Sequence, residues 1–532
     1  MSLLILLLIF TAEWGAYVLL KGKNYNTRQL ARFFVVSFIL CSLAYIVLIS
    51  NELTNTYDGL WKGSYDIGYN WVISIGRWFW PTIGRLRENY SPEPFTSMLS
   101  LACHVCGGII VAYIFGLKDS FKGYIVVLLT VVNTAVCSFL SYRYMSPVFA
   151  FAYLFVIIGI WQLRECTVRS LIISIVMFTL SLGCYQMNIG CACVLIILLT
   201  VWYLQKECEN KKIIKFFCFS AISMISSFII YKIIWNISLK TNHLVTADYK
   251  DADKITPLLV IKSFPRTFVK TYTTFADFFL KDDLKQNIYE NTYIFKVGVF
   301  AFFILAFAHV ISAAFSKGRK RAVFVLLLFM VLPAAANAAL ILAPGSNDFQ
   351  IQMTLPMTVL LPLLLCIVDV GDIKEELLKK IEKIYPLVFT LLLIGNFLMI
   401  SVDQHAMLTG RRAVLSILNI ISSDIDHDSL NGKKCVFIGR PSENPMFAND
   451  EVWDRANDYA KYGKIWLDNY CSTRSYAGFI RESGVLMPQE NDFDLCQEIE
   501  RSTEVKDMPV FPHNGYKKEI NGVIVIKLAD PE

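Results

Sequence analysis

The sequence predicts a polytopic α-helical membrane protein, and three observations support this fold class. Of the 532 residues, 55% are hydrophobic and only 18% are charged, with a mean hydropathy of +0.49. A water-soluble chain of this length needs more charge to cover its surface. The apolar residues also form blocks that approach the ~20 residues with which a helix crosses a bilayer. Finally, the polar residues are concentrated between these blocks.

The apolar blocks predict a bundle of about 11–12 transmembrane helices by the hydropathy criterion. They are residues 3–20, 33–50, 96–116, 123–140, 147–163, 170–186, 187–204, 216–236, 292–315, 322–343, 350–368 and 384–402. The long run at 170–204 is interrupted by Gln186 and Asn188 in "CYQMNIG", which predicts a tight hairpin between two helices. The block at 3–20 lacks a basic N-terminal region and a small-residue cleavage site, so we interpret it as a helix and not as a signal peptide.

Lysines and arginines predict the orientation of the bundle. Every second loop is basic, and these loops are residues 21–32, 116–122, 164–169, 205–215, 316–321 and 372–383. The alternate loops are 51–95, 141–146, 185–188, 237–291, 343–350 and the residues after 402, and the short ones among them carry little charge. The positive-inside rule places the basic set in the cytoplasm and the alternate set outside. Orientation thus explains the formal net charge of +6, which indicates no nucleic-acid partner.

These polar regions suggest two domains. Residues 1–402 form the membrane domain, with long outer loops at 51–95 and 237–291. Residues 403–532 follow as an extracytoplasmic domain, large enough to fold as one unit. A helix-like stretch at 411–423 and strand-like stretches at 433–439 and 522–528 are typical of a small α/β domain.

Two aspartates in the first outer loop are candidate catalytic acids. Asp58 follows its apolar block closely and lies among Tyr57, Trp61 and Tyr65. Partial desolvation there raises the pKa of a carboxyl group, which makes it a usable general base. The alternative for Asp58, and equally for Asp66, is a solvated surface residue or a salt-bridge partner. Together the two carboxylates also suit a divalent cation, Mg²⁺ or Mn²⁺.

Three arginines of the same loop lie where the positive-inside rule disfavours them. Arg77, Arg85 and Arg87 therefore need a compensating partner. One candidate is a phosphate group, which accepts the guanidinium fork in a bidentate manner. The other is the layer of lipid headgroups, with Trp78 and Trp80 as interfacial anchors. Position alone slightly favours the headgroups.

The second outer loop has a similar makeup. In "PLLVIKSFPRTFVKTYTTFADFFL" (257–280), Lys262, Arg266 and Lys270 are four residues apart and would form one basic stripe on a helix. Pro265 argues against a single unbroken helix, although it fits the first turn of a helix that starts there. An interfacial amphipathic segment is the simplest interpretation. Two such loops on one side also favour a shared site for a lipid phosphate.

The hairpin tip "YQMN" (185–188) carries polar residues between two apolar helices. Capping of the helix ends by Gln186 and Asn188 is the favoured interpretation, and contact with a sugar is the alternative.

Three stretches of the sequence resemble the type II Gtr glucosyltransferases. They are "YDGLW…YDIGYNWVISIGRWFWP" after an early helix, "YQMNIG" at the hairpin and "MPVFPHNGYKKEINGVIVIKL" at 508–528. The resemblance covers nearly the whole chain and is most specific at "GRW" (76–78) and "MPVFP". It implies the GT-C class, a bundle of membrane helices with its active site at the outer leaflet. The block at 3–20 departs from the family pattern by adding a helix before the usual first one.

The resemblance also implies a reaction. The donor is a polyprenyl-phosphate-linked hexose, usually undecaprenyl-phosphate glucose, and the acceptor is a cell-surface glycan. The catalytic acid of GT-C enzymes lies in the first outer loop, the place held by Asp58 and then by Asp66. We expect an inverting displacement, a donor synthase and a flippase as functional partners, and contact with membrane lipids. The phosphate would bind Arg77, Arg85, Arg87 or Arg266, and the sugar or acceptor would contact Trp61, Trp78, Tyr185 and Gln186.

The main alternative is a transporter or flippase of a lipid-linked sugar. Transporters often contain inverted repeats and helices that are broken near the middle of the membrane around charged residues. The sequence has neither feature, and its polar residues gather in the loops instead. The pattern therefore favours an enzyme.

Overall fold

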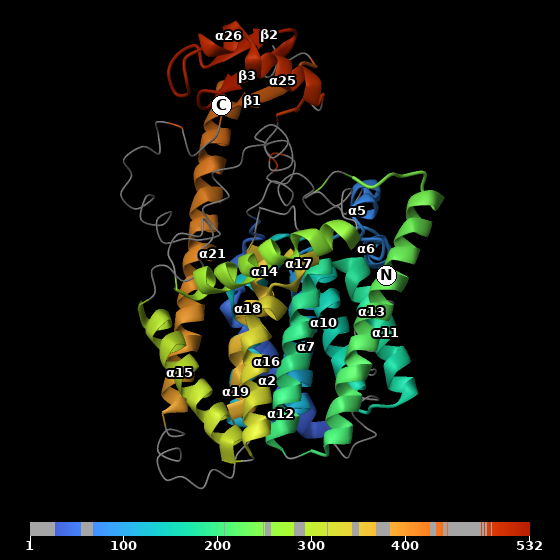
Figure 1. Cartoon of the computed structure of the whole chain (residues 1–532). Helices are drawn as coiled ribbons and strands as arrows, with labels where there is room; N and C mark the ends of the chain where they lie inside the picture. Colours follow the sequence, from blue (N-terminus) through green and yellow to red (C-terminus); the bar gives the residue numbers. More distant parts are fainter. Residues whose placement is uncertain are drawn as a thin grey trace.

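The structure is a bundle of helices from which one long helix leads to a small α/β unit (Figure 1). This computed structural model describes residues 27–54, 68–206, 208–247, 249, 257–280, 293–316, 318–342, 351–368, 384–425, 432–439, 444, 480, 484, 487–490 and 492–531. The end of the bundle from which the long helix continues is uppermost in Figure 1, and we call it the upper end.

The described helices follow the predicted apolar blocks. Each predicted block from residue 33 onward corresponds to one helix or to a short series of helices, whereas block 3–20 lies outside the described residues. The bundle contains α2 (Thr27–Ala44), α3 (Ile46–Ser50), α5 (Tyr69–Ser74), α6 (Trp80–Leu86), α7 (Phe95–Ile114), α8 (Phe121–Val131), α9 (Thr134–Ser141), α10 (Ser146–Leu163), α11 (Val168–Cys184), η1 (Gln186–Asn188), α12 (Ile189–Gln205), α13 (Asn210–Thr241), α14 (Pro257–Leu280), α15 (Tyr293–Ser316), α16 (Arg319–Ala336), α17 (Ala338–Leu342), η2 (Ile351–Thr354), α18 (Leu355–Thr358), α19 (Leu360–Val368) and α21 (Tyr385–Asp424).

The length and composition of these helices confirm a polytopic helical membrane protein. In the described part of the chain, seven helices are long and apolar enough to cross a membrane. The number is eight if α8 and α9, which meet at a bend of 51°, count as one span. The helix α11 is apolar but has only 17 residues, and α16 begins with three basic residues in succession, "RKR". Fewer helices therefore meet the requirements for a span than the predicted 11–12.

Contacts between loops show which of them share an end of the bundle. At the lower end, Arg32 forms an ion pair with Asp119, and the Arg321 guanidinium donates a hydrogen bond to the Leu204 carbonyl over 3.2 Å. At the upper end, Gln186 donates to the Ile75 carbonyl over 3.0 Å. The contacts at the lower end thus involve loops of the basic set or a residue next to one, and the contact at the upper end joins two loops of the alternate set.

Two helix breaks inside the bundle are stabilised by the same kind of contact. Between α2 and α3, the Gln404 amide of α21 accepts a hydrogen bond from Leu48 N (2.9 Å) and donates one to Ala44 O (3.0 Å). These are the two backbone groups that would pair with each other in an unbroken helix. Tyr45, at the break itself, accepts from Asn133 N (3.2 Å) and donates to Val131 O (2.7 Å) between α8 and α9. Each break therefore keeps its buried backbone groups paired.

The long helix α21 also holds the end of α3. The Arg411 guanidinium donates to the carbonyl oxygens of Asn51 (2.7 Å) and Glu52 (2.9 Å), which follow the last turn of α3. Such carbonyls have no partner within their own helix. Helix α21 runs without interruption through the predicted domain junction at residues 402 and 403, so the predicted helices at 384–402 and 411–423 form one element.

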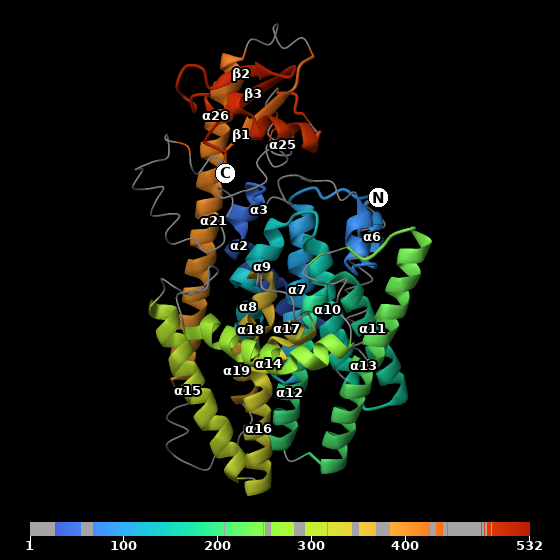
Figure 2. The ribbon, with the colours of Figure 1, turned by 45° about the horizontal axis from the view of Figure 1, so that its top comes forward.

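Helix α14 lies across the other helices at the upper end (Figures 1 and 2). The expectation that Pro265 interrupts this segment is wrong, because α14 continues through it. Thr267, Thr271 and Phe278 are buried on one face of α14, and α14 packs against α16 and α17. Tertiary contacts on this face outweigh the hydrogen bond that proline removes from a helix.

The α/β unit contains a three-stranded sheet in the order β1–β3–β2. The strand β1 (Cys435–Ile438) pairs in parallel with β3 (Val523–Lys527), and β2 (Lys517–Ile520) pairs antiparallel with β3. Asn521 and Gly522 both have positive φ, which suits the tight turn between β2 and β3. Helices α25 (Phe493–Arg501) and α26 (Thr503–Lys506) complete the described part of this unit. The predicted strands at 433–439 and 522–528 are confirmed.

The Gln404 contact predicts a clear effect on stability. Replacing Gln404 by Leu leaves Ala44 O and Leu48 N buried without their partner, and each such group costs about 1–3 kcal/mol. We expect a lower unfolding temperature of the purified protein in detergent. Ser401→Ala is the control, because the Ser401 hydroxyl bonds only within α21, to Phe397 O. Equal unfolding temperatures of the two variants would contradict the role assigned to Gln404.

Candidate active site

Polar and aromatic side chains at the upper end form two neighbouring clusters. The first, here called the arginine–aromatic cluster, consists of Arg77, Trp78, Trp80, Tyr185 and Gln186. These residues come from the segment between α5 and α6, from the first residue of α6 and from the hairpin between α11 and α12. The structure thus brings together four of the residues that the sequence predicts, namely Arg77, Trp78, Tyr185 and Gln186.

Gly76 allows these two segments to approach each other. Its φ of +90° suits glycine, and a Cβ atom there would clash with the Tyr231 hydroxyl and lie 2.8 Å from Gln186 Nε2. Gln186 Nε2 donates to Ile75 O and to the Tyr231 hydroxyl, both over 3.0 Å. The favoured prediction that Gln186 and Asn188 cap helices is wrong, because neither side chain forms a capping hydrogen bond. Gln186 instead joins the hairpin to α13 and to the first loop.

Arg77 lies between two aromatic rings. Its guanidinium carbon is 5.2 Å from the centroid of the Tyr185 ring and 5.5 Å from that of Trp80. Cation–π contacts at such distances stabilise a partly desolvated positive charge. Arg77 Nε and Trp78 Nε1 are buried and have no hydrogen-bond partner among the described residues. The cluster therefore retains two donors that an acceptor such as a phosphate or a sugar hydroxyl would satisfy.

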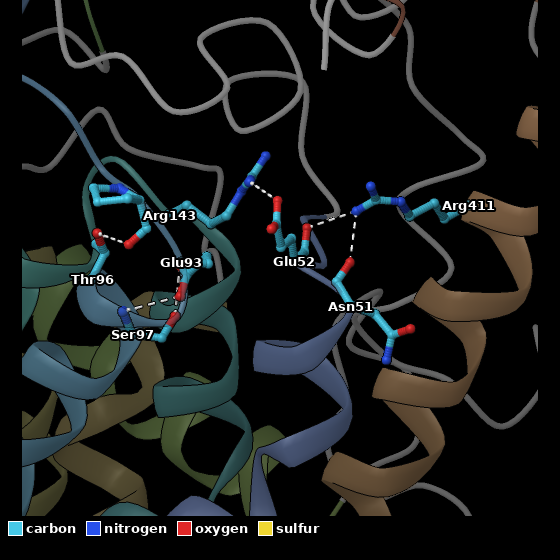
Figure 3. A network of polar contacts seen from close by, with 8 residues as sticks. Asn51, Glu52, Glu93, Thr96, Ser97, Arg143 and Arg411 are labelled. Carbon is cyan, nitrogen blue, oxygen red and sulfur yellow. Dashed lines mark hydrogen bonds and ion pairs between the residues drawn. The ribbon is translucent and has the colours of Figure 1, made fainter. Parts of the chain in front are cut away.

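The second cluster, here called the carboxylate cluster, consists of Glu52, Glu93, Ser97 and Arg143 (Figure 3). Arg143, whose side chain is 1% exposed, contacts Glu52 Oε2 through Nη1 at 3.2 Å. Glu93 accepts hydrogen bonds from the Ser97 hydroxyl (2.8 Å) and from Ser97 N (3.3 Å) at the start of α7. On the other side of Glu52, Arg411 donates a hydrogen bond to the Glu52 backbone carbonyl and so helps to fix this residue (Figure 3).

Glu93 has the proton affinity that a general base needs at neutral pH. Burial raises the pKa of its carboxyl group to about 7, while the Ser97 hydrogen bonds and the charge of Arg143 act in the opposite direction. A base works best when its pKa lies near the working pH. Glu93 lies outside the membrane-spanning helices, directly before α7.

A cavity of about 540 Å³ opens beside the carboxylate cluster. One wall is formed by residues of α2 and α3 between Phe38 and Ser50, and the other by Pro94 and Met98. Glu52 and Glu93 line the same cavity. Its size is within the range of small-molecule sites.

The two clusters are connected through Trp80. This side chain is buried, and its ring contacts the Arg77 guanidinium. The centroid of the same ring lies 6.2 Å from that of Tyr144. Tyr144 follows Arg143 in the chain and accepts a hydrogen bond from Arg87 on its carbonyl oxygen (3.0 Å).

The remaining predicted residues lie elsewhere. Arg87 is buried and also donates to the Ser91 hydroxyl, whereas Arg85 and Arg266 are exposed on α6 and α14. Three others, Asp58, Trp61 and Asp66, lie outside the described residues. The cation site predicted at the two aspartates therefore also lies outside them. Within the described ranges no group of three or more His, Cys, Asp or Glu side chains is placed to hold a metal ion.

Sequence reasoning missed Glu52, Glu93 and Arg143. Arg143 carried a signal, because the positive-inside rule disfavours an arginine in the short outer turn "SYRYMSP" (141–147). Glu52 follows an apolar block directly, at the position where a charge meets the end of a predicted span. Glu93 had no signal of its own, since its pKa depends on burial by residues distant in the sequence.

A comparison with protein families identifies one that covers more than half of the chain. The family model described as glucosyl transferase GtrII matches residues 63–368, which include both Arg77 and Glu93. No curated protein matches the chain significantly. The predicted family is therefore confirmed.

The contact at Gly76 predicts how the arginine–aromatic cluster responds to an added methyl group. Gly76→Ala introduces backbone strain and also displaces Gln186 and Tyr231, which removes hydrogen bonds worth about 1 kcal/mol each. Gly116→Ala is the matched control, because its φ is +81° and nothing lies within 4 Å of the added atom. We expect Gly76→Ala to lower the unfolding temperature more than Gly116→Ala does. The same decrease in both variants would show that backbone strain alone matters at Gly76.

Proposed function

Since the chain belongs to the glucosyl transferase GtrII family, we propose that it transfers glucose from a polyprenyl-phosphate donor to a cell-surface glycan. The reaction takes place at the outer face of the membrane, which is the upper end of the bundle. Multiple membrane helices suit this donor, because its lipid remains in the bilayer while its sugar lies at the interface.

The observation that carries this proposal is the cavity beside the carboxylate cluster. It combines an apolar wall on α2 with Glu52 and Glu93 at the end of two helices. A lipid-linked sugar has the same two parts, an apolar chain and a hydroxyl-rich head. A sugar nucleotide, in contrast, would need no apolar wall next to the bilayer.

The reaction is a displacement at the anomeric carbon. The acceptor hydroxyl gives its proton to a carboxylate, its oxygen bonds to the anomeric carbon, and the bond from that carbon to the phosphate oxygen breaks. Polyprenyl phosphate leaves with the electron pair, and attack from the opposite face inverts the anomeric configuration. The transition state has oxocarbenium character.

The base in this proposal is a carboxylate near the acceptor. Asp58 and Asp66 keep this role as predictions from the sequence. Among the described residues, Glu93 has the strongest support, because its pKa is about 7 and it lines the cavity. Glu52, paired with Arg143, lies beside it and would accept hydrogen bonds from sugar hydroxyls.

The leaving phosphate needs a fixed positive charge. Arg77 has the best support among Arg77, Arg85, Arg87 and Arg266, because its guanidinium lies against aromatic rings, whereas that of Arg87 already donates to Ser91 and to the Tyr144 carbonyl. Trp78, Tyr185 and Gln186, with Trp61, would contact the sugar or the acceptor, since aromatic faces pack well against sugar rings. Mg²⁺ or Mn²⁺ at Asp58 and Asp66 remains a prediction from the sequence, and no step above depends on it. A donor synthase and a flippase would supply the donor at this face.

Reconstitution tests the proposed reaction. The purified protein is placed in vesicles with polyprenyl-phosphate glucose labelled in the sugar, together with surface glycan from a strain lacking the gene. We expect label in the glycan and release of unlabelled polyprenyl phosphate. Movement of intact donor across the vesicle membrane, without label in the glycan, would instead identify a transporter.

The pKa of Glu93 predicts a pH dependence. Only the deprotonated carboxylate accepts a proton, so kcat should rise as the pH increases through about 7. Glu93→Gln should lower the transfer rate by about two to four orders of magnitude, the usual contribution of a general base, and should abolish this rise. Glu88→Gln, at an exposed position nearby, is the control. If the rise persists in Glu93→Gln but disappears in Asp58→Asn, the base is Asp58.

A further inference from the structure

The lipid-facing wall of the cavity is a stripe of α2 and α3. Ile39, Leu43 and Ile46 line the cavity and are 52%, 55% and 53% exposed. Their spacing places them on one side of the helix pair. Helix α2 is also the least buried of the seven candidate spans, with 22% of its residues buried. The cavity is therefore a groove that is open along an apolar, membrane-exposed surface.

The floor of the groove joins α2 to α7. The Ser42 hydroxyl donates to the Met98 sulfur over 3.7 Å, and both side chains line the groove. From Phe38 to Glu52 the chain advances by fourteen residues, which is about 20 Å at the helical rise per residue. This length accommodates several isoprene units of an extended chain.

One end of the groove is polar. Glu52 and Glu93 lie there, and Arg143 adds a positive charge behind Glu52. Ionised carboxylates only accept hydrogen bonds, so they suit a group that is rich in hydroxyl donors. The headgroup of a common phospholipid has fewer hydroxyl groups to offer them than a hexose has. The groove thus matches a lipid chain that ends in a sugar.

We propose that the groove between α2–α3 and the start of α7 holds the isoprenoid chain of the donor. The sugar-bearing end of the donor then lies at Glu52 and Glu93. This inference rests on the proposed function and adds to it the place where the donor lipid binds. The break between α2 and α3, held by Gln404, sets the direction in which the groove approaches Glu52.

Two leucines of α2 provide a matched pair of variants. Leu43 and Leu40 are both exposed, at 55% and 42%, but only Leu43 lines the groove. Leu43→Trp should fill the groove and raise the KM for polyprenyl-phosphate glucose by tenfold or more, whereas Leu40→Trp should leave it unchanged. Both variants should keep the unfolding temperature of the wild type, because both side chains face away from the core. Equal KM values for the two variants would overturn the proposal.

A photoreactive donor locates the lipid directly. The probe is polyprenyl-phosphate glucose with a diazirine on its isoprenoid chain, added to the full-length protein in vesicles. We expect cross-links on α2 and near Met98, which excess unlabelled donor prevents and excess phosphatidylglycerol does not. Cross-links elsewhere, or equal competition by both lipids, would overturn the groove assignment even if glucose is transferred. Cross-links in the groove without transfer would uphold the groove and reject the proposed reaction.

Discussion

The structure depends on the requirement that buried backbone groups be paired. A helix can break inside an apolar bundle only where other groups replace the lost hydrogen bonds. The Gln404 amide does this between α2 and α3, and the Tyr45 hydroxyl does it between α8 and α9. Because both contacts involve the α2–α3 junction, they fix the path of the chain as it enters the upper end. Glu52 follows two residues after α3, so its position is a direct consequence of this pairing.

The same requirement explains why α21 spans both parts of the molecule. Through Gln404 and Arg411 this helix contacts the start and the end of α3, and it then continues to the α/β unit. The helix therefore links the loop that carries Glu52 to the α/β unit.

Hydropathy alone predicted most of the helices, because the bilayer requires long apolar segments and the chain supplies them in order. It could not predict the contacts between them. Gln404 and Leu48 are 356 residues apart in the sequence, and no local pattern relates them. Pro265 was misjudged because packing on the buried face of α14 outweighs a local preference. The prediction that Gln186 caps a helix was wrong for a similar reason. No pattern in the sequence relates Gln186 to its partners, Tyr231 on α13 and Ile75 in the first loop.

The candidate site was predicted only in part for the same physical reason. Arg77, Trp78, Tyr185 and Gln186 were found because their residue types are unusual for their positions. Glu93 is an ordinary acid in the sequence and becomes unusual only when burial raises its pKa to about 7. The sequence identifies residues whose type is energetically unfavourable at their position in the chain. The tertiary structure decides which ordinary residues acquire an altered pKa or reactivity.

The arginines at the upper end differ in how their charge is compensated. Arg143 pairs with Glu52, Arg87 donates to Ser91 and to the Tyr144 carbonyl, and Arg411 donates to two loop carbonyls. These three side chains therefore serve mainly to hold the loops in place. Arg77 differs, because the contacts of its guanidinium within the described ranges are with the aromatic rings of Trp80 and Tyr185. Aromatic faces stabilise a cation but leave its N–H groups unsatisfied, so an anionic ligand gains more from Arg77 than from an arginine that is already paired.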